Sequence, residues 1–248
     1  MRDSVKGANV IEVFSSIQGE GKYVGYRQLF VRFEGCNLKC DYCDTEHEAG
    51  SHERCRIESV IGSQNFSFYD NPVDCDFLAD EINSMLLALP HHAASITGGE
   101  PLMESDYLFK LLPNINAPIL LETNGTMPRE LKMLLPMVDI ISMDIKLPSE
   151  VNRELWDLHR DFLRIASEKD LYVKIVVADE TKDDELRRAF ELIASTDNNI
   201  PLILQPVTPK GMSNKPSAKK IMGAQKIALS ALRDVRIIPQ THVMMNLL

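Results

Sequence analysis

Residues 30–45 read FVRFEGCNLKCDYCDT, in which an apolar strand runs into a loop that contains Cys36, Cys40 and Cys43. The three cysteines have C-x3-C-x2-C spacing. A cubane iron–sulfur cluster has four irons, so a loop with three thiolates leaves one iron without a protein ligand. An open metal position binds a substrate or cofactor directly, whereas a closed four-cysteine site carries electrons or stabilises a fold. The loop therefore predicts a [4Fe-4S] cluster with one position open to a small molecule.

The composition favours a single domain that acts on a small molecule. A chain of 248 residues is long enough for one large core, and we expect residues 1–248 to form one domain. The formal charge of −9 argues against a surface that binds nucleic acid through its phosphates. The sequence has no uninterrupted apolar run of about 18 residues, so we expect no membrane span.

The amino-terminal sequence and the cysteine content both favour the cytoplasm. MRDSVKGANV has no apolar segment of the kind found in export signals. Five cysteines, an odd number, fit metal ligation in a reducing compartment better than a disulfide framework. We therefore expect a cytoplasmic protein.

From residue 76 onward, helical and strand-like patterns alternate along the chain. Segment 200–204 is a continuous apolar run, as expected of a parallel strand buried on both faces. Repeated β–α crossovers predict an α/β fold, a partial, TIM-like parallel barrel. The expected strands are 10–14, 28–33, 93–97, 118–122, 138–143, 171–177, 200–204 and 235–238, and the expected helices are 77–89, one ending at 108–112, 129–135, 151–167, 183–194 and 217–232.

A polar, irregular insertion at about 46–75 interrupts this pattern. Residues 54–61 alternate between polar and apolar side chains, which makes them a candidate for one strand of a hairpin. Cys55 and Cys75 lie in or beside the insertion. Two thiols are too few for a second cluster, so we interpret both as ordinary cysteines.

Polar side chains gather where the expected strands end, which is where parallel α/β folds place their sites. TGGEP (97–101) has paired glycines that let the backbone approach a ligand, and its Glu100 adds an anion. Ser142, Asp144 and Lys146 share one face if their strand continues, although a surface Asp144–Lys146 ion pair is the alternative. Lys174 is either an inward partner of a carboxylate or a solvated residue. Further strand ends carry ETNGT (122–126), QPVTP (205–209) and PQTH (239–242).

Two further features near the cysteine loop, the sequence IQGEG and the residue Thr45, each have an ordinary structural interpretation. IQGEG (17–21) is either a glycine-rich turn or part of a binding loop. Gln18 and Glu20 supply the amide and the carboxylate that match the alternating donors and acceptors of a pterin edge. Thr45, two residues after the last cysteine of the loop, is a candidate helix cap.

The three-cysteine loop and TGGEP resemble the radical S-adenosylmethionine (SAM) superfamily. Within that superfamily, a series of motifs along nearly the whole chain resembles the 7-carboxy-7-deazaguanine synthase family in sequence and in order. The resemblance is weakest in the insertion and around Trp156. That series is IQGEG, EGCNLKCDYCDT, TGGEP, ETNGT, SMDIK, QPVTP and PQTH.

The resemblance implies a role for particular residues. Cys36, Cys40 and Cys43 would ligate the cluster, and the hydroxyl of Thr45 would ligate Mg2+, a hard cation that prefers oxygen. The implied SAM contacts are Tyr42, Cys43, Asp44, Gly99, Glu100, Ser142, Asp144, Lys146, Gln205, Pro206, Val207 and Thr208. The implied substrate contacts are Ile17, Gln18, Gly19, Glu20, Arg32, Thr97, Gln240 and His242.

The same resemblance implies the conversion of 6-carboxy-5,6,7,8-tetrahydropterin to 7-carboxy-7-deazaguanine with loss of ammonia, in queuosine and archaeosine biosynthesis. SAM supplies a radical that abstracts a substrate hydrogen and later returns it, and Mg2+ orients the substrate, so we assign no separate acid–base side chain. The resemblance further implies an electron donor such as flavodoxin or ferredoxin, and a homodimer.

Two other hypotheses stay open at this point. A glycyl-radical-enzyme activase shares the three-cysteine loop but does not call for IQGEG or Thr45. A non-catalytic iron–sulfur or zinc module requires a fourth ligand, for instance Cys55 or His47.

Overall fold

The computed structural model describes residues 7–40, 43, 50–208 and 215–247. Its strands form one ten-stranded sheet in the order β10-β9-β8-β7-β6-β5-β2-β1-β3-β4. The strands are β1 (Val10–Ile17), β2 (Arg27–Phe33), β3 (Arg54–Val60), β4 (Asn65–Asp70), β5 (Ala94–Gly98), β6 (Ile119–Thr123), β7 (Ile140–Asp144), β8 (Asp170–Val177), β9 (Leu202–Pro206) and β10 (Val235–Ile237).

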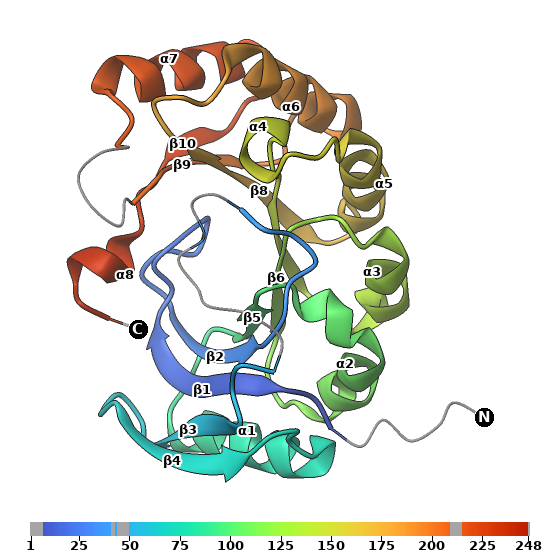
Figure 1. Cartoon of the computed structure of the whole chain (residues 1–248), viewed down its shortest axis with the longest axis vertical. Helices are drawn as coiled ribbons and strands as arrows, with labels where there is room; N and C mark the ends of the chain where they lie inside the picture. Colours follow the sequence, from blue (N-terminus) through green and yellow to red (C-terminus); the bar gives the residue numbers. More distant parts are fainter. Residues whose placement is uncertain (1–6, 41–42, 44–49, 209–214, 248) are drawn as a thin grey trace.

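The sheet is parallel from β2 through β5 to β10, because each crossover passes through a helix that returns the chain to the same edge. Strand β1 is antiparallel to β2. Strands β10 and β4 are the two ends of the sheet order, so the sheet does not close on itself. It curves into an open barrel with helices on its outer side (Figure 1). The prediction of a partial barrel is confirmed.

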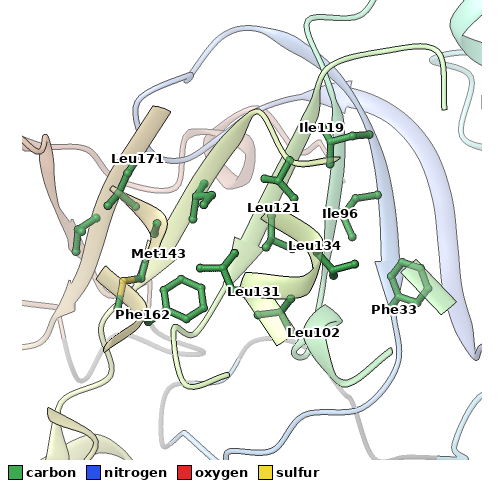
Figure 2. Packing of buried hydrophobic residues seen from close by; sticks show 14 of the residues in the cluster. Phe33, Ile96, Leu102, Ile119, Leu121, Leu131, Leu134, Met143, Phe162 and Leu171 are labelled. Atoms are coloured by element: carbon green, nitrogen blue, oxygen red, sulfur yellow. The ribbon is translucent and has the colours of Figure 1, made fainter. Parts of the chain in front are cut away.

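Helices α1, α2, α3, α5, α6 and α7 cover the outer face of the sheet because each has buried apolar residues on one side. In α6, the buried side chains are Leu186, Ala189, Phe190 and Ile193, at helical spacing. Figure 2 shows the resulting core, in which Leu131 and Leu134 lie against strand residues such as Leu121. The helices are α1 (Cys75–Ala88), α2 (Ser105–Leu111), α3 (Pro128–Leu134), α4 (Pro148–Val151), α5 (Trp156–Ala166), α6 (Asp183–Thr196), α7 (Ala218–Ala228) and α8 (Thr241–Met244), with 3-10 turns at Pro101–Glu104, Leu112–Asn114 and Leu135–Met137.

Three features differ from the sequence-based expectation. The expected helix 151–167 is wrong as one element: α4 ends at Val151, because the next residue, Asn152, has a left-handed backbone (φ 52°), and α5 begins at Trp156. The insertion is more regular than expected, because β3 and β4 form an antiparallel hairpin that extends the main sheet beside β1. Helix α8 was not expected at all.

No helix in the described ranges combines the length and apolar character needed to cross a membrane.

Candidate active site

A pocket of about 360 Å3 lies within the open barrel, a volume typical of small-molecule sites. Its lining joins the carboxyl ends of β5 to β9 to the loop after β1 and to the segment around α8. The predicted site residues that line it are Ile17, Gln18, Gly19, Glu20, Arg32, Cys40, Cys43, Thr97, Ser142, Asp144, Lys146, Gln205, Val207, Thr208, Gln240 and His242.

Four of the predicted residues that the structure describes are not among those that line the pocket. Gly99 and Glu100 lie behind it, and Cys36 and Pro206 are likewise outside its lining. Tyr42, Asp44 and Thr45 fall outside the described residues.

The sequence-based search missed several lining residues. Phe14, Phe30 and Val176 are strand residues whose apolar character gave no functional signal. Glu122 was visible as the start of ETNGT, and Lys174 was considered as an inward partner; both line the pocket, and the inward interpretation of Lys174 is confirmed.

The cysteine loop supplies three partly buried cysteines, none of them in a disulfide bond, after the carboxyl end of β2. Burial raises the pKa of the Cys36 thiol and raises that of Cys40 to about 11, and the neighbouring cysteines add to the effect at Cys40. Because burial disfavours the charged thiolate, a thiolate at this position needs a cation beside it. The irons of an iron–sulfur cluster, which cysteine thiolates ligate, would supply that positive charge. In the described ranges no three Cys, His, Asp or Glu side chains are arranged to hold a metal ion, so this fit rests on the thiols themselves.

Cys55 does not belong to this site. It is fully buried in the hydrophobic core on β3, and burial raises its pKa to about 12. His47, the other fourth-ligand candidate, lies outside the described residues.

The TGGEP turn packs against the cysteine loop because its glycines have no side chain. A Cβ on Gly99 would lie 2.0 Å from the carbonyl oxygen of Gly35. The amide of Glu100 donates to that same oxygen at 2.9 Å. The paired glycines thus hold the cysteine loop against β5.

The Glu100 side chain joins two strand-end loops. It is fully buried and accepts hydrogen bonds from the Thr123 hydroxyl (2.8 Å), the Asn124 amide (2.7 Å) and the Leu102 amide (3.1 Å). Burial raises the pKa of this carboxyl to about 7, although the donated hydrogen bonds lower it in part. Glu100 therefore fixes TGGEP to ETNGT behind the pocket.

Ser142, Asp144 and Lys146 all line the pocket, as predicted; alternation along β7 accounts for Ser142 and Asp144, whereas Lys146 lies two residues beyond the end of the strand. Lys146 Nζ lies 2.8 Å from Asp144 Oδ2, and these side chains are only 12% and 14% exposed, so the alternative of a surface ion pair is wrong. Burial alone would lower the pKa of Lys146, but the charges of Asp144 and Cys40 outweigh it and the pKa is raised.

Two buried oxygens near these residues have no hydrogen-bond donor among the described residues: Asp144 Oδ1 and Gln205 Oε1. They belong to β7 and β9, and both residues line the pocket. Acceptors in this position suit the hydroxyl and amino groups of a nucleoside such as that of SAM.

The Glu20 carboxylate pairs with β8 and with the segment before α8. Lys174 Nζ contacts Glu20, and Gln240 Nε2 donates to it at 2.7 Å. Burial would raise the pKa of Glu20, but the charge of Lys174 and these hydrogen bonds outweigh it and lower the pKa to about 2. Gly19 is needed beside them, because a Cβ there would lie 2.2 Å from Nδ1 of His242.

A second carboxylate faces the same space. Glu122 accepts from Gln18 Nε2 at 2.8 Å and from the Thr97 hydroxyl at 2.9 Å. The Gln18 amide oxygen in turn accepts from the backbone of Glu20 at 3.0 Å, which fixes the orientation of the amide. The pocket thus combines two carboxylates with an oriented amide, a set suited to a heterocycle with several N–H donors.

These features define the class of protein: an open α/β barrel with a three-cysteine loop at the edge of its pocket. The profile of the radical SAM superfamily matches residues 30–196, and the chain is a member of that superfamily. A crystal structure of QueE from Escherichia coli has the same fold, with a TM-score of 0.59 at 19% identity over 94% of each chain.

Full-length relatives narrow the assignment. The chain is 48% identical to 7-carboxy-7-deazaguanine synthase of Geobacter sulfurreducens, over 98% of this chain and 99% of the relative. It is 33% identical to the enzyme of that name from Methanopyrus kandleri, over 97% of this chain and 94% of the relative. The chain therefore belongs to the 7-carboxy-7-deazaguanine synthase family.

Proposed function

We propose that this protein converts 6-carboxy-5,6,7,8-tetrahydropterin to 7-carboxy-7-deazaguanine and ammonia, a step in 7-deazapurine biosynthesis. The observation that carries the proposal is the near-complete match to relatives of that activity, in a chain whose pocket presents Gln18, Glu20 and Glu122 together. The reaction removes one ammonia from the substrate and leaves no net oxidation or reduction.

The pocket residues bind and orient the substrate in this scheme. The carboxylates of Glu20 and Glu122 accept from N–H groups of the pterin, and Gln18 completes the alternating pattern. Arg32 binds the substrate carboxylate, because a guanidinium suits a planar anion. Thr97 and His242 flank these groups, and the Phe14 and Phe30 rings, stacked at 5.2 Å, form an apolar wall that excludes water.

The cofactors are assigned to residues by the same proposal. Cys36, Cys40 and Cys43 hold the [4Fe-4S] cluster, and the strand-end residues Ser142, Asp144, Lys146 and Gln205 to Thr208 hold SAM, with Gly99 shaping its approach. When bound, cluster and SAM together supply the radical that starts the rearrangement. Thr45 is the proposed ligand of Mg2+, and Tyr42 and Asp44 are proposed to contact SAM.

The remaining features extend the proposal beyond the site. We propose a single cytoplasmic domain that acts as a homodimer and receives electrons from a flavodoxin or ferredoxin. A small-molecule substrate agrees with the formal charge of −9.

Anaerobic reconstitution tests the function directly. Protein with a rebuilt cluster, reductant, SAM, Mg2+ and the pterin should release a deazapurine and ammonia in equal amounts. A glycyl-radical-enzyme activase would show no turnover of the pterin, and a non-catalytic module would leave the spectrum of the reduced cluster unchanged on addition of SAM. Either result would overturn the proposal.

The magnesium assignment has a separate test. Thr45→Ala should weaken the dependence of turnover on Mg2+ while the iron and sulfide content of the protein stays the same. An unchanged response to Mg2+ would remove Thr45 from the site.

A further inference from the structure

Three neighbouring strands place a row of charges beside the pocket. Glu12 on β1 lies opposite Arg32 on β2 and opposite Arg56 on β3. Arg32 Nε donates to Glu12 Oε1 at 2.7 Å, and Arg56 Nε donates to Glu12 Oε2 at 2.8 Å. Both oxygens of a carboxylate that is only 6% exposed are thus held by guanidinium groups from two different strands.

An irregularity in β1 creates this row. The pairing of β1 with β2 shifts between Val10 and Glu12, so that Val10 lies opposite Phe33 but Glu12 lies opposite Arg32. One extra residue on β1 turns the Glu12 side chain to the face that carries Arg32, because side chains alternate along a strand. A regular ladder would have placed Ile11 there.

Aromatic rings support the charged row on the same strands. The Arg32 guanidinium lies 5.8 Å from the centre of the Phe14 ring, and Phe14 stacks on Phe30. The Arg56 guanidinium lies 4.6 Å from the centre of the Phe66 ring on β4. Each arginine is therefore held by the shared carboxylate and by a ring, which restricts the rotation of its long side chain.

This arrangement leaves the end of Arg32 available to a ligand. Within the described part of the chain, Glu12 is its only hydrogen-bond acceptor, and the bond uses Nε. The two Nη groups remain on a side chain that lines the pocket. A guanidinium with Nε engaged and both Nη groups open presents a fork to a planar anion.

We propose that Glu12 and Arg56 are positioning residues for Arg32, so that the β3–β4 hairpin controls how tightly the pocket binds the carboxylate of its substrate; this rests on the proposed function. Arg56 holds one oxygen of Glu12, Glu12 holds Nε of Arg32, and Arg32 meets the substrate. The hairpin, which the sequence presents as an insertion, would thus support the substrate site from outside the pocket lining, through Glu12 and Arg32.

A matched pair of hairpin variants tests the inference. Arg56→Met removes the charge that holds Glu12 but keeps an apolar side chain over Phe66. Arg54→Met is the control: Arg54 lies on the same strand, 5.5 Å from the centre of the Phe68 ring, and its acidic partner is the exposed Asp70 at 3.6 Å. We expect Arg56→Met to raise KM for the pterin about tenfold, which corresponds to about 1.4 kcal/mol, with KM for SAM unchanged, and Arg54→Met to change neither.

A double-mutant cycle separates positioning from general damage to the fold. In an Arg32→Lys background, which has no Nε fork, Arg56→Met should have little further effect on KM for the pterin. Arg56→Lys, which keeps a charge near Glu12, should restore part of the affinity. A tetrahydropterin without the 6-carboxylate should inhibit the wild type and Arg56→Met equally.

The outcomes are distinct. If the wild type turns over the pterin and Arg56→Met behaves as Arg54→Met does, or if the Arg56 effect persists in full without Arg32, the positioning role is wrong and the proposed function stands. If the wild type does not turn over the pterin, the proposed function fails and this inference fails with it.

Discussion

The pKa values of two glutamates near the pocket are shifted in opposite directions, although burial raises the pKa of both. Glu20 faces the pocket and has a pKa of about 2, whereas Glu100 lies behind it and has a pKa of about 7. Glu20 contacts the ammonium of Lys174, while the hydrogen-bond donors to Glu100 within the described ranges are neutral groups of Thr123, Asn124 and Leu102.

The difference shows what a buried carboxylate needs in order to stay ionised. Neutral donors offset only part of the cost of desolvation, so Glu100 holds a proton near neutral pH. A cation in contact reverses the balance, so Glu20 stays charged and available to a ligand with N–H donors. Burial alone does not decide which glutamate keeps its charge.

Removing the cation from Glu20 should have the largest effect. Lys174→Met leaves the Glu20 carboxylate without its counter-charge, and we expect a loss of about 4 kcal/mol in the free energy of unfolding, measured by urea denaturation at pH 8. The pKa of Glu20 should then rise above its ordinary range, as that of Glu100 does.

Lys22→Met is the control for that variant. Lys22 pairs with Asp170 at 2.6 Å at the protein surface, so its loss should cost less than about 1 kcal/mol. Equal losses for Lys174→Met and Lys22→Met would contradict the role of Lys174.

The raised pKa of Glu100 predicts a specific pH dependence. Because the folded pKa is about 7 against an ordinary 4.5, the contribution of Glu100 to stability is fully present below pH 4.5 and is lost as pH rises through 7. We expect the difference in unfolding free energy between wild type and Glu100→Gln to change by on the order of 3 kcal/mol between pH 4.5 and pH 8.

His159 also contributes to the pH dependence of the unfolding free energy, so the curve of either protein by itself does not isolate Glu100. Burial lowers its pKa to about 4, so its contribution is present above pH 6.5 and is lost as pH falls through 4, the opposite slope in an overlapping window. Both proteins contain His159, so the difference between their urea curves removes it. Parallel curves across this range would refute the raised pKa of Glu100.

Among the changes around the two glutamates, Thr123→Val should have the smallest effect. The Thr123 hydroxyl lies 2.8 and 2.9 Å from the two Glu100 oxygens, and valine keeps the shape of the side chain without the donor. We expect a loss of about 1 kcal/mol in the free energy of unfolding and a further rise in the pKa of Glu100. Urea denaturation across the same pH range would measure both, and a lowered pKa would show that the hydroxyl does not favour the charged form.

Much of the site could be predicted because it follows the strand ends. Ser142 and Asp144 lie on one face since β7 alternates, and they lie at the pocket since parallel strands end at one edge. The Gln18–Glu122 bond could not be predicted in the same way, because its partners are 104 residues apart. Periodicity reports which face a residue takes, and it does not report which distant residue lies opposite.

The amino-acid sequence by itself determined the three-cysteine loop, the alternation of strands and helices and the polar strand ends, since these depend on spacing along the chain. Only the tertiary structure decided which glutamate meets a lysine, and that Glu12 joins Arg56 of the β3–β4 hairpin to Arg32, which lines the pocket. The physical reason is that the energy of a buried charge depends on its neighbours in space, and those neighbours come from strands far apart in the sequence.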